Sequence, residues 1–241
     1  MQTMVFGRKA TLAVVYTERY LMPLVCFSLA WMDLHKFWAN GLGPNRTERF
    51  LLAAIASHLL YSQRQVFTGF LLLLARRTLA PPRSLKDVLV PLAVSFYFFS
   101  YEVIPWLPAL FQKNLCPVHQ QTFFTYLGLS LNLMGLTVAL CSVASLGRSF
   151  GVFIEVKNIV TNGTYRWARH PMYSGYICLI TGIGLVNFSL AYFILVPINI
   201  ALISYRSRLE EERLSEYSPE YREYRNRTGR FFPKFRQLWM G

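Results

Sequence analysis

Long apolar runs alternate with short polar segments along the chain, and the length of each run predicts how it folds. Four of the runs are long enough to cross the hydrocarbon core of a bilayer as a single helix, which takes about 20 residues. They occupy residues 20–38, 50–75, 87–110 and 121–146. A fifth block, residues 172–205, is too long for one straight crossing. Small or polar residues lie near its middle, at Gly182, Gly184, Asn187 and Ser189. We therefore expect a helical hairpin here, and an all-α membrane protein with five or six transmembrane helices.

The polar residues are distributed unevenly between two parts of the chain. Residues 1–120 hold the first three spans and their loops, with no chemical motif that we recognise. Residues 121–241 hold the fourth span, a polar loop, the hairpin and a basic C-terminal segment. We expect the first part to be a set of membrane helices and the second part to be the functional core.

Positive charge predicts the orientation of the helices. Cytoplasmic loops of membrane proteins carry an excess of Lys and Arg. If the N-terminus is cytoplasmic, 20 of the 25 Lys and Arg residues fall on that side, and three fall on the other side. We therefore expect both termini to be cytoplasmic, in a bacterial inner membrane or the endoplasmic reticulum. Residues 147–175 and 206–236 then flank the hairpin on the cytosolic face, where they meet at one polar site.

The composition argues against several other classes of protein. Hydrophobic residues make up 54% of the chain and charged residues 15%, whereas soluble domains have about 25% charged residues. A soluble enzyme, a disordered chain and a secreted disulfide scaffold therefore fit poorly. The net charge of +13 lies in clusters between apolar runs rather than along a stripe, so we expect no nucleic-acid partner. The four cysteines have wide, unrelated spacings that match neither a zinc site nor a redox pair, and we expect no metal.

Distinctive polar residues stand on both sides of the hairpin. The first group is Arg169-His170-Pro171-Met172-Tyr173-Ser174-Gly175, with Tyr165 upstream, and the second begins with Glu210-Glu211-Glu212. In this order the motifs resemble the isoprenylcysteine carboxyl methyltransferase and phospholipid methyltransferase superfamily of membrane enzymes, over about residues 135–235. The resemblance implies methyl transfer from S-adenosyl-L-methionine, in a cytosolic cofactor pocket that both motifs line.

The residues of the first motif suit such a cofactor. Pro171 is favourable in the first turn of a helix, where its missing N–H is not needed. The start of a helix offers free N–H groups and a positive dipole end to the cofactor carboxylate. Arg169 is able to add a bidentate contact to the same carboxylate. Gly175 leaves room for close approach, and Tyr173 is able to stack on a flat ring or face a cation.

The run of glutamates suits the cationic end of the cofactor. Three like charges at the C-terminal end of a helix oppose the helix dipole, and a sulfonium or ammonium group offsets that cost. The resemblance favours Glu210 and Glu211 as the matching pair. However, the spacing to Tyr221 is one residue shorter than in the family, and Pro219 stands where Phe-Gly is usual. Which two of the three, Glu212 included, face the cofactor is left open by the sequence.

The resemblance and the residue chemistry together define a predicted site. The cofactor-binding residues are Tyr165, His170, Pro171, Tyr173, Gly175, Glu210 and Glu211. The candidate catalytic residues are Arg169, which is placed to orient an anionic acceptor, and His170, because histidine is the residue type whose unperturbed pKa lies near neutrality. A structural role is favoured for His170, because a carboxylate acceptor arrives ionised and needs no base. The expected acceptor is a lipid, a prenylated protein or another lipophilic molecule with a carboxylate, amine or thiol.

Two other functions are alternatives. A membrane sterol or enone reductase that uses NADPH has a related His-Pro motif, but Asn is usual there at the position of Met172 and an acidic residue at that of Tyr176. Both differences favour the methyltransferase. A non-catalytic scaffold or transporter is the second alternative, although the two halves of the chain show no internal symmetry. No Gly-rich turn follows a strand, which argues against a Rossmann-type methyltransferase.

Each motif also has an ordinary structural explanation when it is taken alone. The Arg-His-Pro run is typical of a helix cap at the membrane interface, the tyrosines of an aromatic belt, and the glutamates of a solvated helix face. Gly182 and Gly184 favour close helix packing over phosphate binding. Glu102, Arg64 and His58 lie within apolar spans, where they either have a function or pair between helices, and we leave them out of the core site.

Overall fold

The regular structure of the described residues is helical, as the apolar pattern predicts. The computed structural model describes residues 13–40, 65–74, 79–103 and 107–234. A π-helical turn (Thr17–Leu21) leads into the helices α2 (Met22–Asn40), α4 (Lys86–Val103), α5 (Ala109–Gln112), α6 (Val118–Leu146), α7 (Pro171–Asn187), α8 (Leu190–Tyr217) and α9 (Pro219–Arg227). Residues 65–73 are also helical. The β-structure within these ranges is limited to isolated bridges, so the prediction of an all-α fold is confirmed.

Two of the described helices are long and apolar enough to span a membrane, at His119–Ser149 and Leu190–Tyr217. This is fewer than the five or six spans expected from the sequence. Within the described residues α4 has 18 residues, the last of them Val103, and α7 has 17. The second predicted span, 50–75, falls largely outside the described residues. His58 and Arg64 fall outside them too, as does the side chain of Glu102.

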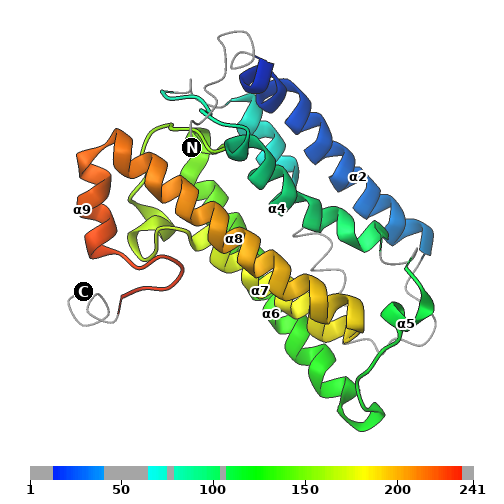
Figure 1. The fold of residues 1–241 in the computed structure, drawn as a ribbon. Coiled ribbons are helices and arrows are strands. Elements are labelled where there is room, and N and C mark those ends of the chain that lie inside the picture. The colour runs from blue at the N-terminus through cyan, green and yellow to red at the C-terminus, as the bar shows by residue number, and fades with distance from the viewer. Residues whose placement is uncertain (1–12, 41–64, 75–78, 104–106, 235–241) are drawn as a thin grey trace.

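The apolar block at 172–205 is a pair of helices, as predicted (Figure 1). Helix α7 begins at Pro171, in the first-turn position where proline costs nothing, with His170 as the N-cap residue. It ends where Phe188 adopts the left-handed conformation at φ 41°, and α8 begins two residues later. The break therefore lies beside Asn187 and Ser189, two of the residues that predicted it.

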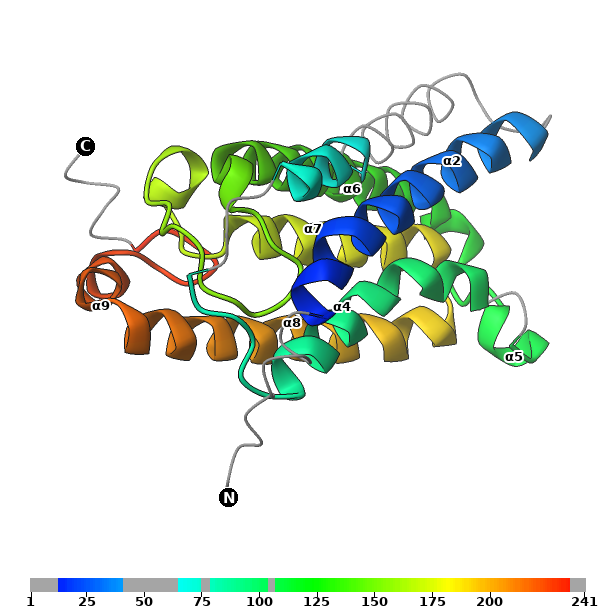
Figure 2. The same cartoon turned by 90° about the horizontal axis from the view of Figure 1, so that it is seen from above.

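Helices α6 and α7 lie side by side along their length because glycines let their backbones touch (Figures 1 and 2). A Cβ atom added at Gly182 would lie 2.4 Å from the carbonyl oxygen of Gly128, and one added at Gly175 would lie 2.6 Å from that of Gly135. Seven residues separate the glycines on each helix, which is two helical turns, so the two contacts repeat along one face. Small residues in this arrangement are typical of closely packed membrane helices.

The glycine contacts predict a strong dependence on position within α7. In Gly182→Ala the new methyl group meets backbone atoms of α6, which cannot move without shifting the helix. In Gly184→Ala the nearest atom is Val196 Cγ2 at 3.0 Å, a side-chain atom that can rotate away. We expect Gly182→Ala to lower stability by about 1–3 kcal/mol and Gly184→Ala to have a much smaller effect. Thermal unfolding of both variants in detergent tests this, and equal effects would contradict the packing described here.

The C-terminal segment folds back onto the start of α7 at the end of the molecule that carries α9 (Figure 2). Residues Ala168 and Gly229 form an isolated parallel bridge, and the N–H groups of Arg169 and His170 donate to the carbonyls of Gly229 and Arg230, each at 2.9 Å. Segments 147–175 and 206–234 therefore meet beside the hairpin, as the sequence predicts for the described part of these segments.

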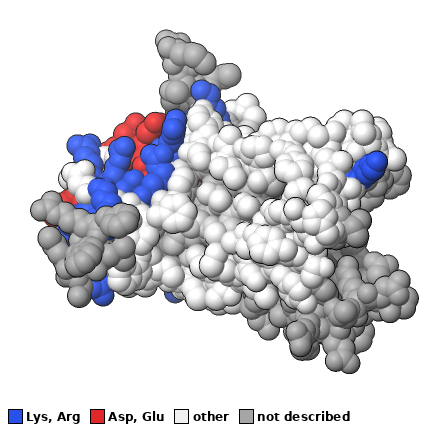
Figure 3. All heavy atoms as spheres, turned by 90° about the horizontal axis from the view of Figure 1, so that it is seen from below, with Lys and Arg blue, Asp and Glu red and all other residues white. Residues whose placement is uncertain are grey.

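Charged side chains gather at this same end (Figure 3). Most of the remaining surface on that face is uncharged. Large apolar side chains are exposed on the outer surfaces of the helices, including Leu24, Trp31, Phe123, Phe193 and Ile198. An exposed apolar surface of this kind, with most of the charge gathered at one end, is typical of contact with a hydrophobic partner or a membrane.

Candidate active site

A cavity opens between the end of α8, α9, the start of α7 and the loop that follows α6. Its empty volume, including the part continuous with solvent, is ≈ 880 Å³. Among its lining residues are Tyr165, Arg169, His170, Tyr173, Glu210, Arg213, Tyr221 and Tyr224. The cavity thus brings together residues from both predicted motifs.

Glu211 lies beside the cavity and holds its walls together. The carboxylate is 1% exposed. Its oxygens lie 2.8 Å from Arg169 Nε, 2.9 Å from Arg230 Nη2 and 3.6 Å from Arg225 Nε. Arg169 lies at the start of α7, Arg230 in the segment after α9, and Arg225 at the end of α9. One carboxylate therefore joins three parts of the chain to α8.

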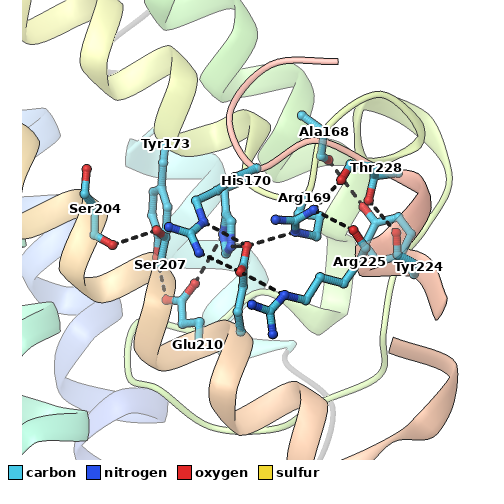
Figure 4. A network of polar contacts seen from close by, with 12 residues as sticks. Ala168, Arg169, His170, Tyr173, Ser204, Ser207, Glu210, Tyr224, Arg225 and Thr228 are labelled. Carbon is cyan, nitrogen blue, oxygen red and sulfur yellow. Dashed lines mark hydrogen bonds and ion pairs between the residues drawn. The ribbon is translucent and has the colours of Figure 1, made fainter. Parts of the chain in front are cut away.

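Glu210 points into the cavity and is bound differently. Its Oε1 atom accepts hydrogen bonds from the Tyr173 hydroxyl and, at 2.9 Å, from Arg206 Nε (Figure 4). Arg206 is buried, donates to the Val152 carbonyl at 2.6 Å, and stacks over the Tyr173 ring with its guanidinium carbon 5.3 Å from the ring centroid. With a side chain 21% exposed, Glu210 retains carboxylate surface that a ligand can reach.

Of the three glutamates, Glu210 lines the cavity, Glu211 is buried against arginines, and Glu212 is exposed. Glu211 contacts Arg169, Arg225 and Arg230. Its predicted contact with the cofactor stays a prediction.

His170 forms part of the cavity wall. Its ring stacks on Tyr173 with centroids 5.3 Å apart and an interplanar angle of 7°. Nε2 lies 3.2 Å from a Glu211 oxygen but without the angle of a hydrogen bond, and Nδ1 lies 3.6 Å from Glu210. The imidazole is 6% exposed, and its contacts position it between the two carboxylates.

Three tyrosines form another part of the cavity wall. Burial raises the pKa of Tyr224 to about 12 and holds the pKa values of Tyr165 and Tyr221 above their usual range. All three phenols therefore stay neutral at physiological pH. The Tyr224 hydroxyl donates to the carbonyls of Tyr165 and Ala168, which fixes the turn before the Arg-His-Pro run (Figure 4). This wall offers aromatic surface rather than a base.

Arg169 and the first turn of α7 make contacts within the protein. Arg169 donates through Nε to Glu211 and through Nη1 to the carbonyls of Arg225 and Thr228, so it is committed within the protein (Figure 4). The N–H groups of Tyr173 and Ser174 donate to the His170 carbonyl. The predicted contact of Arg169 with the cofactor carboxylate stays a prediction.

Gly175 and Pro171 also have roles that the packing explains. Gly175 contacts the backbone of α6 and is not part of the cavity lining. Pro171 is buried at the first turn of α7 and is likewise absent from the lining. Their predicted contacts with the cofactor stay predictions, and the structure gives both of them a role in building the helix that carries His170 and Tyr173.

Several residues of the site were missed by sequence reasoning. The loop between α6 and α7 contributes Glu155 and Lys157, which pair at 2.6 Å. Glu18, in the turn before α2, accepts hydrogen bonds from the N–H groups of Val152 and Phe153 and so ties the N-terminal part to this loop. No motif marks these positions. Arg206 had one usable signal, its i, i+4 spacing to Glu210.

A second cavity, with an empty volume of ≈ 700 Å³, adjoins the first. It lies among α2, the helical segment 65–73, α4 and the start of α7, and most of its lining is apolar. The lining includes Met22, Val25, Leu29, Val94, Phe150, Met172 and Arg206. Gly151 and Met172 line both cavities. The polar cavity and the apolar one therefore share a boundary at the first turn of α7.

Comparisons with known proteins agree with the motif region. The phospholipid methyltransferase family matches residues 123–218. A cobalt-zinc-cadmium resistance protein of Cupriavidus metallidurans is 33% identical over 119 residues, covering 47% of this chain and 52% of that protein. A protein-S-isoprenylcysteine O-methyltransferase of Xenopus laevis is 27% identical over 161 residues, covering 61% of this chain and 54% of that protein. The matches thus span about half the length of these curated relatives.

The resemblance found in the motifs is therefore confirmed. The C-terminal part of the chain is homologous to the phospholipid and isoprenylcysteine methyltransferases. A nickel-cobalt-cadmium resistance protein of Alcaligenes xylosoxydans xylosoxydans is also similar, at 30% identity over 113 residues that cover 44% of this chain and 50% of that protein. Among the described residues there is no group of three or more His, Cys, Asp or Glu side chains placed to hold a metal ion.

Proposed function

We propose that this chain, whose C-terminal part is homologous to the phospholipid methyltransferase family, is an integral membrane methyltransferase that uses S-adenosyl-L-methionine. The observation that carries the proposal is the meeting of the Arg-His-Pro and Glu-Glu motifs at one polar cavity, which adjoins an apolar cavity at Met172. A methyl donor with charged groups and a lipophilic acceptor need two such compartments with a shared boundary.

The residues of the polar cavity fit the cofactor. Glu210 presents a carboxylate to cationic groups, and Tyr165 and Tyr221 present neutral aromatic surface to an adenine ring. When bound, the cofactor supplies an electrophilic methyl group on a sulfonium. The protein contributes position, since aligning a nucleophile with a methyl carbon lowers the barrier by several kcal/mol. Arg169 and His170 hold the first turn of α7, and with it Tyr173, at the boundary between the cavities.

The apolar cavity suits the expected acceptor, a lipid or prenylated molecule with a nucleophilic carboxylate, amine or thiol. Arg206 lines this apolar cavity and also pairs with Glu210, which lines the polar cavity. The boundary between the two cavities therefore carries a charge pair. Two long apolar helices and the exposed apolar side chains support a position within the membrane. The concentration of basic residues at the cavity end supports a cytosolic location for the cofactor cavity and for both termini.

Methyl transfer into lipid is the direct test of this function. The purified chain is reconstituted in vesicles made from lipids of its own host membrane and supplied with S-adenosyl-L-methionine labelled in the methyl group. We expect label to enter the organic-soluble or membrane-associated fraction, and Glu210→Gln to reduce that label. Transfer only to water-soluble small molecules would contradict a lipophilic acceptor.

The apolar cavity predicts a second result, which separates acceptor from cofactor. Val25 lines this cavity, whereas the neighbouring Leu24 is 61% exposed on the outer face of α2. We expect Val25→Phe to lower methyl transfer about 10-fold or more. The larger ring occupies space that the acceptor needs, and a mismatch of even one methylene between a substrate and a hydrophobic pocket costs about that much in rate. Binding of S-adenosylhomocysteine should stay unchanged. Leu24→Phe is the matched control. Equal losses of methyl transfer in both variants would contradict the assignment of the acceptor to this cavity.

A further inference from the structure

We propose that Arg213 binds the carboxylate of S-adenosyl-L-methionine, an inference that rests on the proposed function. Arg213 lies near the end of α8, is 8% exposed and lines the polar cavity. Its Nη2 atom donates to the Pro81 carbonyl at 2.7 Å, whereas Nε and Nη1 are buried with no hydrogen-bond partner. A buried guanidinium with two unused nitrogens is costly unless an anion meets it.

The other cations around the cavity already have acidic partners. Lys157 pairs with Glu155 at 2.6 Å, Arg169 with Glu211 at 2.8 Å, and Arg206 with Glu210 at 2.9 Å. Within the part of the chain that the structure describes, Arg213 is the cavity-lining cation for which no carboxylate lies within ion-pair distance. An anionic ligand group in this cavity would therefore find its unpaired cationic partner at Arg213.

The position of Arg213 relative to Glu210 points to an amino-acid group. The two side chains stand three residues apart on α8, so they project from neighbouring turns of the same helix face into one cavity. One offers a carboxylate and the other a guanidinium. The methionine end of the cofactor carries an ammonium and a carboxylate on the same carbon, together with the sulfonium nearby. A guanidinium is also the side chain best shaped for bidentate contact with a carboxylate.

Two nucleosides that differ only in the carboxylate test this assignment. Binding of S-adenosyl-L-methionine and of decarboxylated S-adenosylmethionine is measured by calorimetry for the wild-type chain and for Arg213→Met. We expect the wild-type chain to prefer the first ligand, and Arg213→Met to weaken it by roughly 10- to 100-fold while leaving the second nearly unchanged. Arg213→Lys keeps the positive charge but not the two parallel N–H groups of the guanidinium. It should recover part of the lost affinity for S-adenosyl-L-methionine. Arg208→Met removes an exposed arginine from the same helix and is the matched control.

The remaining outcomes overturn the assignment in distinguishable ways. Equal weakening of both ligands in Arg213→Met would make Arg213 a structural residue that acts through its hydrogen bond to Pro81. Unchanged binding of both ligands, with methyl transfer reduced, would place the missing anion on the acceptor. If the folded wild-type chain binds neither nucleoside, the proposed function itself fails, and that result is independent of any Arg213 variant.

Discussion

Replacing Glu211 by Gln is expected to destabilise the folded chain by about 3–5 kcal/mol, because a buried charge pair loses one partner. The carboxylate is 1% exposed and pairs with Arg169, whose side chain is 8% exposed. A glutamine keeps the size but leaves this guanidinium buried without a counter-charge. Arg225 and Arg230 are 46% and 29% exposed, so solvent screens their share of the loss. Thermal unfolding in detergent measures the effect.

Glu212→Gln is the control for this variant, since it makes the same chemical change one residue along the helix at an exposed position. It should unfold at the wild-type temperature. Cofactor binding by Glu211→Gln is expected to fall as well, because the start of α7 loses its attachment to α8. A stable Glu211→Gln chain with impaired cofactor binding would show instead that this carboxylate contacts the ligand directly.

Replacing Glu210 by Gln is expected to weaken binding of S-adenosyl-L-methionine, and also to lower stability, because Arg206 is left buried without its counter-charge. A charge-assisted contact contributes about 1.5–3 kcal/mol, which corresponds to a loss of roughly 10- to 150-fold in affinity. S-adenosylhomocysteine lacks the sulfonium charge, so its affinity should fall by less. The ratio of the two dissociation constants, measured for the variant and the wild-type chain, isolates the part of the effect that depends on the sulfonium.

The same ratio distinguishes a direct contact from an indirect one. Glu210 also pairs with Arg206 and accepts a hydrogen bond from Tyr173, so the variant disturbs both side chains. An effect that acts through displacement of Arg206 or Tyr173 would weaken the binding of both nucleosides equally. Equal losses would therefore contradict the contact between Glu210 and the sulfonium, even if the losses are large.

The order of the helices and the hairpin were predictable because they depend on local patterns. Pro171 at the start of α7 and the break beside Asn187 and Ser189 follow from the conformations that these residues favour or avoid. The number of spans stays a prediction, because the two helices that are long and apolar enough to cross a membrane were found among the described residues alone. Apolar content does not fix the length of a helix: α7 has 17 residues, and α4 has 18 within the described part of the chain.

The site was predictable in its residues but less so in their partners. The motifs indicated that Glu210, His170 and Tyr173 come together, and they line one cavity. The sequence did not indicate that Arg169 and Glu211 would bind each other, because the contact joins positions 42 residues apart through the fold. Arg213 was missed for the same reason. Arg213 stands out because two of its buried nitrogens have no hydrogen-bond partner, and a sequence does not show which side chains will be left without partners.

Calorimetric binding of S-adenosylhomocysteine, with NADPH as the comparison, tests the central claim most directly. The chain is purified in detergent and shown to be folded before titration. We expect saturable binding of S-adenosylhomocysteine in the micromolar range and no binding of NADPH. Binding of NADPH alone would identify a reductase and reassign Tyr173 and Glu210. Binding of neither ligand by folded protein would contradict the cofactor cavity and favour a non-catalytic membrane protein.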